Sequence, residues 1–519
     1  MVLVAWMGLR MFRHGSPPPM KVGIWYWHSP FQVTDAELGW LKKIGVSTIY
    51  VRAATFTTDG VHVKTMIPQT WNSNAKGMPI VLTFNFDGGL RSHFEKFSNA
   101  TIVADVLPAI ARIRKTARAK GIHVAGIQMD VDCPTRLLPK YARLIHSIGD
   151  GLRKKGTLES KDSFSTTALQ TWLNSRHYQD LVDACDFVAP QFYEGQIGRT
   201  LDKVRPVADA GNLENGMARA ESAGKPYFVG IATYGHALLF DKGGRLIAMY
   251  HGMQPEDALR HPSLSFEGTF PMAENGRRAG ARDGIGEDLL ILKAVHPDMN
   301  GRGLGFHIAY VLPTAEMLAR ELKIVRENAS SNCQGVILYR YPEVADELNL
   351  PLQTMAQSFA GKKATVAIEP SLKRRSVPWS LIGTGQTANK VPYEYSLTVK
   401  SIGSAPTMAT PGAVSVMVAF DGIGLDNVEP GDFDHAQTGV LMSDRSFRAC
   451  APAHANAVLF DRYHMLPGAT LHAGAIEVGA DGPSPKEVSW VVDCPDGVNY
   501  VQGTKDIIYT DRIRKEAVR

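Results

Sequence analysis

The 519-residue sequence lacks the features that mark several large classes of protein. It has no run of about 20 apolar residues of the kind that forms a membrane-spanning helix. Its formal net charge is only +5, with basic and acidic residues well mixed, and this gives no indication of nucleic-acid binding. No internal repeat or low-complexity tract is present. We therefore predict neither an integral membrane segment nor a nucleic-acid partner.

Cysteine is scarce as well, with five residues in the whole chain. No group of cysteine and histidine has the spacing of a zinc site, and no glycine-rich loop precedes a helix as in phosphate-binding loops, so no metal and no cofactor is predicted. Cys133, Cys185 and Cys333 fall at or near expected strands, where buried thiols are common. A disulfide bond between Cys450 and Cys494 would indicate an oxidising compartment.

Residues 1–20 are predicted to form an N-terminal tail. They contain a short apolar stretch, Arg10, Arg13 and a Ser-Pro-Pro-Pro sequence. In a signal peptide the positive charges precede the apolar part, whereas here they follow it. Two interpretations stay open, a leader of a periplasmic or secreted protein and sequence upstream of a start at Met20.

Strand-like and helix-like segments alternate over residues 21–360. Apolar, β-branched and aromatic residues mark eight expected strands at 22–28, 48–56, 80–87, 124–132, 163–172, 187–194, 227–234 and 335–341. Apolar residues at three- and four-residue spacing mark helices at 36–43, 103–119, 137–154, 173–184 and 314–328. Eight such alternations predict a parallel (β/α)8 TIM barrel.

The alternation of strand-like and helix-like segments stops after about residue 360. A chain of 519 residues also exceeds the length that one hydrophobic core usually supports, so a second domain is expected. Residues 361–392, which include the basic Lys373-Arg374-Arg375, are predicted to form a linker. Short strands are expected beyond it at 395–400, 414–420, 438–442, 457–460, 470–478, 488–492 and 507–509. Because turns rich in Pro, Gly and Asp separate these strands, residues 393–519 are predicted to form a β-sandwich domain.

Two acids lie side by side on the fourth expected strand. Side chains two residues apart on a strand point the same way, so Gln128, Asp130 and Asp132 share a face. Neighbouring buried carboxyl groups acquire different pKa values, which suits acid/base chemistry. A capped strand end or an ion pair to a buried arginine would explain the same pattern. Arg52 is a candidate partner that would keep Asp130 ionised.

Polar or aromatic residues also occur at the ends of all eight expected strands, where TIM barrels place their chemistry. The aromatic faces could stack on sugars, although each could equally fill the core. Trp25 and Trp27 share a face, so both line the interior or both pack under helices. The candidate substrate-binding residues are Trp25, Trp27, His28, Arg52, Asp87, Gln128, Trp172, Gln191, Tyr234 and Tyr339.

Three motifs resemble those of family 18 glycoside hydrolases, the chitinase-like barrels. Residues 126–132, 191–194 and 230–235 look like the D-G-x-D-x-D-x-E, M-x-Y-D and G-x-x-x-Y-G motifs of that family. The stretch at about 236–313, between strand seven and the last helix, sits where many of those enzymes carry an α+β insertion. Residues 25–28, 84–88, 128–132 and 167–172 also resemble an uncharacterised bacterial barrel family, domain of unknown function 3142.

The family 18 resemblance implies four catalytic residues. Asp132 would be the proton donor, Asp130 would orient and tune it, and Tyr193 would hydrogen-bond the group that attacks the anomeric carbon. Glu194 aligns with the second acid. The chain departs from the family because Asp132 stands where those enzymes have Glu, and a displacement of about 1 Å can cost on the order of a hundredfold in rate. Ala125 and Gln128 replace the first two Asp positions.

The leading interpretation is a glycoside hydrolase that acts on a polysaccharide. If the sugar carries an N-acetyl group, its carbonyl can be the nucleophile, held by Asp130 and Tyr193; otherwise Glu194 or Asp87 must activate water or attack directly. A non-catalytic carbohydrate-binding barrel and an envelope scaffold protein are the alternatives. The oligomeric state stays open.

Overall fold

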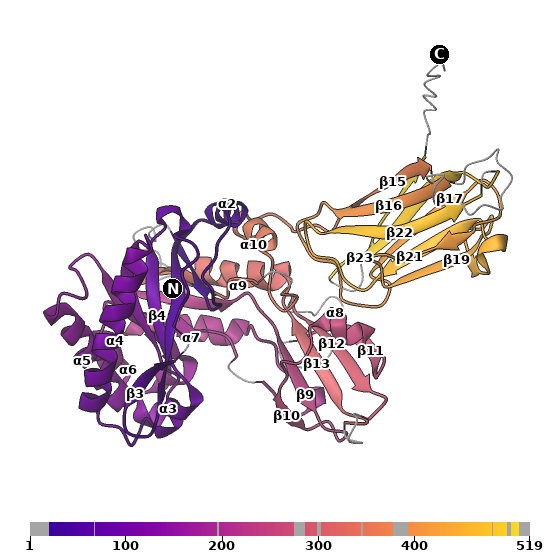
Figure 1. Cartoon of the computed structure of the whole chain (residues 1–519). Helices are drawn as coiled ribbons and strands as arrows, with labels where there is room; N and C mark the ends of the chain where they lie inside the picture. The colour runs from indigo at the N-terminus through magenta and orange to yellow at the C-terminus, as the bar shows by residue number, and fades with distance from the viewer. Residues whose placement is uncertain are drawn as a thin grey trace, which may run out of the picture.

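The computed structural model describes residues 20–66, 68–194, 197–273, 286–297, 303–343, 346–376, 393–479, 481–495 and 500–507. Residues 1–19 of the predicted tail and residues 377–392 of the predicted linker lie outside these ranges. The described chain forms a barrel, a sheet inserted into it and two C-terminal sheets (Figure 1).

Eight parallel strands close the barrel, as the sequence predicted. β1 pairs with β2 on one side and with β14 on the other, which completes the ring. The short antiparallel strand β3 (Val63–Met66) extends β2 outside the ring. The barrel strands are β1 (Lys21–Tyr26), β2 (Val46–Thr58), β4 (Ile80–Phe86), β5 (Val124–Asp130), β6 (Ser163–Leu169), β7 (Phe187–Gln191), β8 (Tyr227–Ala232) and β14 (Cys333–Tyr339).

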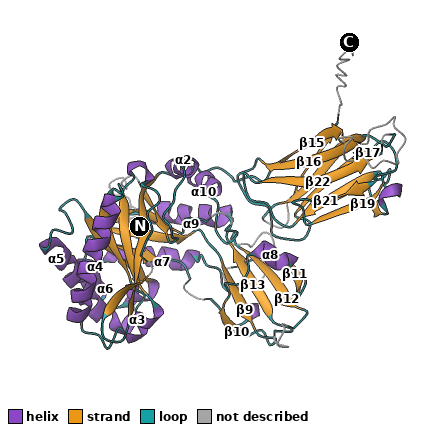
Figure 2. Cartoon of the chain, in the orientation of Figure 1, coloured by secondary structure: helices purple, strands orange, loops and turns teal. Residues whose placement is uncertain are grey.

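Helices surround this ring (Figure 2). They are α2 (Asp35–Ile44), α3 (Gly88–His93), α4 (Asn99–Ala119), α5 (Leu138–Lys154), α6 (Tyr178–Asp183), α7 (Ala210–Ser222), α9 (Ala315–Asn328) and α10 (Leu352–Phe359). Local sequence sets the ends of α2, because Thr34 and Glu37 form a capping box and Gly45 ends the helix with φ +86°. The helix expected at 173–184 is shorter, since residues Gln170–Asn174 form a 3₁₀ turn before α6.

Helix α7 has no counterpart among the expected helices. Gly216 weakens its helical signal, yet this residue has no room for a side chain because a Cβ there would lie 2.0 Å from the Phe192 ring. The main core lies between the ring and its helices. Ile127, Met129 and Val131 are buried in it, so the apolar face of β5 points outward and the acidic face inward.

A five-stranded antiparallel sheet interrupts the barrel between β8 and α9, in the expected position. Its strand order is β10-β9-β13-β12-β11. The elements are β9 (His236–Phe240), β10 (Leu246–Met249), α8 (Pro255–Arg260), β11 (Leu264–Pro271), β12 (Asp288–Ala294) and β13 (His307–Leu312). We call this part the insertion.

Two antiparallel sheets with a shared hydrophobic core form the C-terminal part, in the orders β15-β16-β22-β18 and β20-β19-β21-β17-β23-β24. The strands are β15 (Ile368–Ser376), β16 (Tyr393–Ser401), β17 (Val414–Phe420), β18 (Asn427–Val428), β19 (His435–Leu441), β20 (Phe447–Ala449), β21 (Ala457–Arg462), β22 (Thr470–Val478), β23 (Pro485–Asp493) and β24 (Tyr500–Asp506).

Two expectations about this part need correction. Residues 368–376 of the predicted linker are a strand, because β15 pairs with β16 over its whole length. The final strand precedes the expected one at 507–509, of which residues 508 and 509 lie outside the described ranges. Alternation in these segments is weak, and pairing to a neighbouring strand decides their structure.

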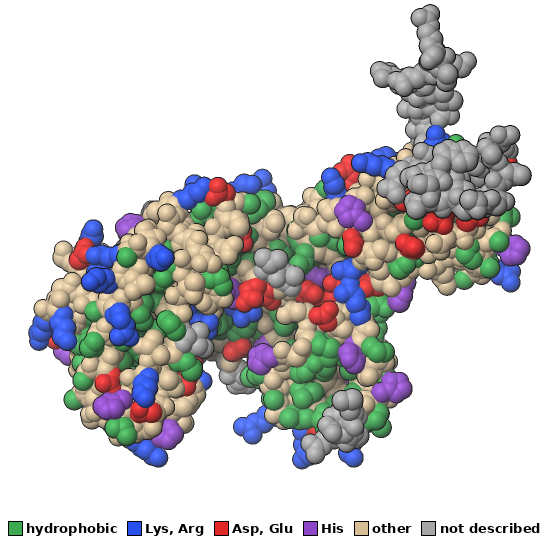
Figure 3. Space-filling model, in the orientation of Figure 1, with side chains coloured by type: hydrophobic (Ala, Val, Ile, Leu, Met, Phe, Trp, Pro, Cys, Tyr) green, Lys and Arg blue, Asp and Glu red, His purple; other side chains and the backbone are tan. Residues whose placement is uncertain are grey.

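The insertion and the C-terminal sheets meet through a cluster of charged side chains (Figure 3). Arg260 contacts Asp434, whose side chain is only 4% exposed. Arg462 pairs with Glu256 at 2.7 Å, and Arg260 pairs with the same carboxylate at 2.8 Å. These contacts tie the two parts of the chain together.

All five cysteines lie within the described ranges, and none of them forms a disulfide bond. Cys450 and Cys494 are therefore not bridged in this structure. Among the described residues, no helix combines the length and the apolar character that crossing a membrane requires.

Candidate functional site

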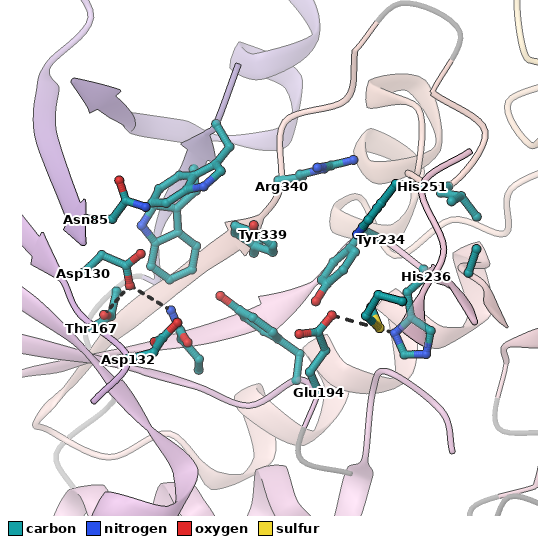
Figure 4. A pocket seen from close by; sticks show the side chains of 18 of the residues that line it. Asn85, Asp130, Asp132, Thr167, Glu194, Tyr234, His236, His251, Tyr339 and Arg340 are labelled. Atoms are coloured by element: carbon teal, nitrogen blue, oxygen red, sulfur yellow. Dashed lines mark hydrogen bonds and ion pairs between the residues drawn. The ribbon is translucent and has the colours of Figure 1, made fainter. Parts of the chain in front are cut away.

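A cavity of about 390 Å³ opens at the C-terminal ends of the barrel strands. Strand ends from around the ring supply most of its lining. The insertion adds His236, Ala237, Met249, Tyr250 and His251, and Arg91 of α3 and Leu348 complete it. Figure 4 shows Asp130 and Asp132 on one side of the cavity and Glu194, Tyr234 and His236 on the other. Nine predicted site residues line it, namely Trp25, Trp27, Asp130, Asp132, Gln191, Tyr193, Glu194, Tyr234 and Tyr339.

Asp130 is the last residue of β5, and the pKa of its carboxyl group is strongly raised. Burial and the neighbouring charge of Asp132 raise the pKa of Asp130 to about 7. Two hydrogen bonds to Oδ1 act in the opposite direction, one from the Thr167 hydroxyl at 2.6 Å and one from Gln191 Nε2 at 3.3 Å. Asp130 is thus held in a fixed orientation and changes its protonation state near neutral pH.

Asp132 follows the end of β5 and reaches further into the cavity. Its side chain is 43% exposed, and one carboxylate oxygen lies 3.5 Å from Nη1 of Arg91. Burial raises the pKa of Asp132, the Arg91 charge lowers it, and the Glu194 charge raises it, with a net rise above the ordinary value. The cation beside the two aspartates is therefore Arg91 from α3, and not Arg52, which the sequence suggested as the partner of Asp130.

Glu194 faces the two aspartates from the end of β7 and has a backbone φ of +55°, which is uncommon for a residue with a side chain. Its carboxylate lies 3.8 Å from Nδ1 of His236, a side chain that is only 3% exposed. Burial raises the pKa of Glu194, but interactions with His236 and the Tyr234 hydroxyl outweigh it and lower this pKa below its ordinary value. The site therefore holds a carboxyl group biased toward ionisation opposite two biased toward protonation.

Aromatic rings form the floor between these acids. Tyr193 and Tyr339 stack with centroids 5.2 Å apart and an interplanar angle of 10°. Tyr234 meets both rings edge-on, and Tyr339 also contacts Trp25 and Trp27. Burial raises the pKa of Tyr193 far above its ordinary value, and its buried hydroxyl has no hydrogen-bond partner.

Gln128 and Trp172, both predicted to bind substrate, lie outside the cavity. The Gln128 side chain is fully buried and accepts a hydrogen bond of 2.8 Å from Trp25 Nε1, so it supports the cavity wall from below. Trp172 is 1% exposed, donates to the Cys133 carbonyl at 3.2 Å and packs on Tyr141. The 3₁₀ turn after β6 directs this indole into the core, which corrects its predicted stacking role.

Three further predicted residues have structural contacts away from the cavity lining. His28 bonds the Tyr341 carbonyl at 2.7 Å and contacts Glu343. The Arg52 guanidinium lies over the Trp27 ring, 5.9 Å from its centroid. Asp87 is the N-cap of α3 and accepts hydrogen bonds of 2.7 Å from the Leu90 amide and the Thr57 hydroxyl.

Several lining residues were not among the predicted ones, chiefly Arg91, Thr167, His236, His251 and Arg340. Thr167 lies near the end of β6 and Arg340 directly follows β14, so their positions carried a signal, whereas His236 begins β9 of the insertion. Arg91 lies on a short helix and His251 on a loop of the insertion, and nothing local in the sequence connects them to the site. Within the described part of the chain, no group of His, Cys, Asp and Glu could hold a metal ion.

Residues 76–250 match the family model "Domain of unknown function (DUF3142)". This match confirms the resemblance carried by the strand-end segments, over the part of the barrel that includes Asp130, Asp132, Tyr193 and Glu194. No curated protein matches the sequence significantly.

Several solved barrel structures are similar to the chain at low sequence identity. The spore cortex-lytic enzyme SleL of Bacillus cereus has a TM-score of 0.42 and 14% identity, covering 67% of this chain and 75% of its own. A chitinase of Chromobacterium violaceum has a TM-score of 0.41 and 17% identity, covering 66% and 99%. Chitinase ChiA74 of Bacillus thuringiensis has a TM-score of 0.42 and 9% identity, covering 93% and 100%.

Proposed function

We propose that this protein is a glycoside hydrolase that cleaves a polysaccharide, with Asp132 as the proton donor. One observation carries the proposal: Asp130 and Asp132, with raised pKa values, face Glu194, whose pKa is lowered, across one cavity floored by aromatic rings. Carboxyl groups whose surroundings move their pKa values apart are typical of an acid paired with a base or nucleophile.

The chemistry assigns a task to each of these groups. Glycoside cleavage requires a proton for the leaving oxygen and a negative or polar group opposite the carbon that develops positive charge. Asp132 supplies the proton, because its raised pKa favours the acid form. Asp130 changes the charge beside Asp132 as it titrates near pH 7. Glu194 is ionised and activates water or stabilises the positive carbon.

Tyr193 suggests what else the substrate presents. Its hydroxyl is buried next to the acids and has no hydrogen-bond partner, and such a group costs free energy unless a ligand satisfies it. An acceptor oxygen on the sugar, such as an amide carbonyl, would satisfy it. In that case the carbonyl could act as the nucleophile, and Asp130 with Tyr193 would hold it.

One contact favours a second function, carbohydrate binding without turnover. Arg91 lies next to Asp132 and would hold it as a carboxylate if the pair tightened. The observed separation of 3.5 Å and the 42% and 43% exposure of the two side chains describe a weak, solvated contact. The net rise in the pKa of Asp132 favours the hydrolase.

The test is to incubate the purified protein with a panel of bacterial and plant polysaccharides and to measure new reducing ends. Asp132→Asn keeps the shape of the side chain and removes the proton, so it should abolish cleavage while the thermal midpoint does not fall. Asp150→Asn, on the outer helix α5, is the matched control and should cleave like the wild type. Binding of a polysaccharide with no new reducing ends would support the binding protein instead.

A further inference from the structure

The end of β7, which carries Tyr193 and Glu194, is held by a neighbouring stretch of chain. Tyr193 pairs with Ala208 in an isolated antiparallel bridge. The Glu194 amide donates a hydrogen bond of 3.1 Å to the Val207 carbonyl. Residues 207 and 208 belong to no helix or strand, so their own position must be fixed by another part of the protein.

Glu287, the residue before β12 of the insertion, holds residues 207 and 208 in place. Its Oε1 accepts hydrogen bonds from the Val207 amide at 3.0 Å and the Ala208 amide at 3.4 Å. Glu287 is 1% exposed, so water does not offer these amides an alternative acceptor. A series of hydrogen bonds thus connects the insertion, through residues 207 and 208, to the segment after β7 that carries Glu194.

The backbone around Glu287 is itself anchored. The Glu287 carbonyl accepts a hydrogen bond of 2.9 Å from the Met272 amide. The preceding Gly286 accepts a hydrogen bond from the Thr314 hydroxyl and has a φ of +92°. A Cβ on Gly286 would lie 2.4 Å from the Met317 amide nitrogen, so only glycine permits this approach to α9. These contacts fix the backbone of residues 286 and 287, from which the carboxyl group of Glu287 extends.

We propose that Glu287 is a positioning residue, which fixes Tyr193 and Glu194 in the cavity through Val207 and Ala208. Its consequence for catalysis rests on the proposed hydrolase function, whereas its effect on the strand end does not. The insertion thereby does more than deepen the cavity, because one of its side chains determines where the second acid stands.

A nearby glutamate provides a matched control. Glu321 on α9 is 3% exposed, burial and the charge of Glu287 raise its pKa, and it makes no hydrogen bond to residue 207 or 208. Replacing Glu321 removes a buried acid from the same region and leaves the contacts of residues 207 and 208 untouched.

The experiment is amide hydrogen exchange, resolved by residue, on the full chain. Glu287→Met keeps the length of the side chain and removes the acceptor, so exchange at Val207, Ala208 and Glu194 should accelerate about tenfold or more. Glu287→Gln keeps an acceptor oxygen and should retain wild-type protection. Glu321→Met should leave these three amides unchanged. If the Met variant does not fold, Glu287→Asp withdraws the acceptor by one carbon and should accelerate the same amides.

Faster exchange at residues 207 and 208 with an unchanged Glu194 amide would overturn the proposal, because Glu287 would then be a local structural contact only. Glu287→Gln exchanging like Glu287→Met would overturn it as well. If the wild type cleaves a polysaccharide, Glu287→Met should lower kcat more than it raises KM, and Glu287→Gln should restore kcat. If no polysaccharide is cleaved, the proposed function fails while the exchange result still decides the role of Glu287.

Discussion

The Thr167 hydroxyl donates a hydrogen bond of 2.6 Å to Asp130, from the neighbouring strand of the barrel. This bond stabilises the ionised carboxylate and therefore limits the rise in its pKa. Thr167→Val removes the donor with little change in shape and should move the pKa of Asp130 upward from about 7 by roughly one unit. The measurement is a carbon NMR titration of the Asp130 carboxyl group. Thr167→Ser keeps the hydroxyl donor and is the control, in which the pKa of Asp130 should not move. An unchanged pKa in the Val variant would show that the Thr167 hydrogen bond does not stabilise the carboxylate.

Asp130→Asn should change both turnover and stability. A raised pKa means that the folded protein binds a proton that the unfolded chain releases, so stability falls as pH rises from the ordinary pKa of 3.8 to about 7. The Asn variant lacks this loss and should melt at a higher temperature than the wild type above pH 7, with the difference vanishing below pH 4. Its rate of cleavage should fall, and its pH profile should lose the transition near pH 7. Equal melting temperatures of the variant and the wild type at every pH would contradict the raised pKa of Asp130.

Trp172 and Trp27 offer a paired test of core against cavity. Trp172→Ala should cost about 3–5 kcal/mol of unfolding free energy, because it leaves a large hole in the core, while oligosaccharide affinity is retained in the protein that folds. Trp27→Ala should lower affinity by about 1–3 kcal/mol, the usual loss for a ring-stacking contact, with a smaller effect on stability. Thermal unfolding and oligosaccharide titration on both variants check this. The reverse pattern would place the binding surface at β6.

Glu287→Gln should stabilise the protein in alkaline solution. Burial raises the pKa of Glu287 to about 8, and the acidic neighbours Asp288 and Asp209 add to the rise. Burial and the charge of Glu287 also raise the pKa of Glu321. Because the folded pKa is raised, stability falls as pH rises from the ordinary 4.5 to about 8. The melting temperature of the Gln variant should exceed that of the wild type, and the difference should grow as pH rises across this range. A difference that is the same at every pH would contradict the raised pKa of Glu287.

Asp434→Ala should loosen the contact between the insertion and the C-terminal sheets. The carboxylate is 4% exposed and contacts Arg260 and Arg462, so its removal leaves two partly buried cations without this partner. Both cations keep Glu256 as a partner, so the expected loss is about 1–3 kcal/mol of unfolding free energy. Asp257→Ala is the control, because that side chain is 66% exposed and lies 3.9 Å from Arg260. Urea unfolding of both variants measures the difference, and equal losses would show that the contact does not hold the two parts together.

The C-terminal part shows how far local pattern reaches. Strands with clear apolar alternation, such as β17 and β22, lie where the sequence predicts them. Residues 368–376 carry basic residues and a proline and read as a linker, yet they pair along the whole of β16. The hydrogen bonds of that neighbouring strand, which no local pattern reveals, decide the outcome.

The sequence by itself determined the barrel and the orientation of Asp130 and Asp132. Period-two alternation fixes which face of β5 is acidic, and the order of strand and helix leaves few ways to arrange a parallel sheet. Only the tertiary structure decided which strand-end residues reach the cavity. Trp172 turned into the core, and Arg91 replaced Arg52 as the neighbouring cation. The insertion brought His251 to the cavity and Glu287 to the backbone of residues 207 and 208. Such contacts join residues far apart in the chain, and burial and charge act through distances in space that sequence spacing does not encode.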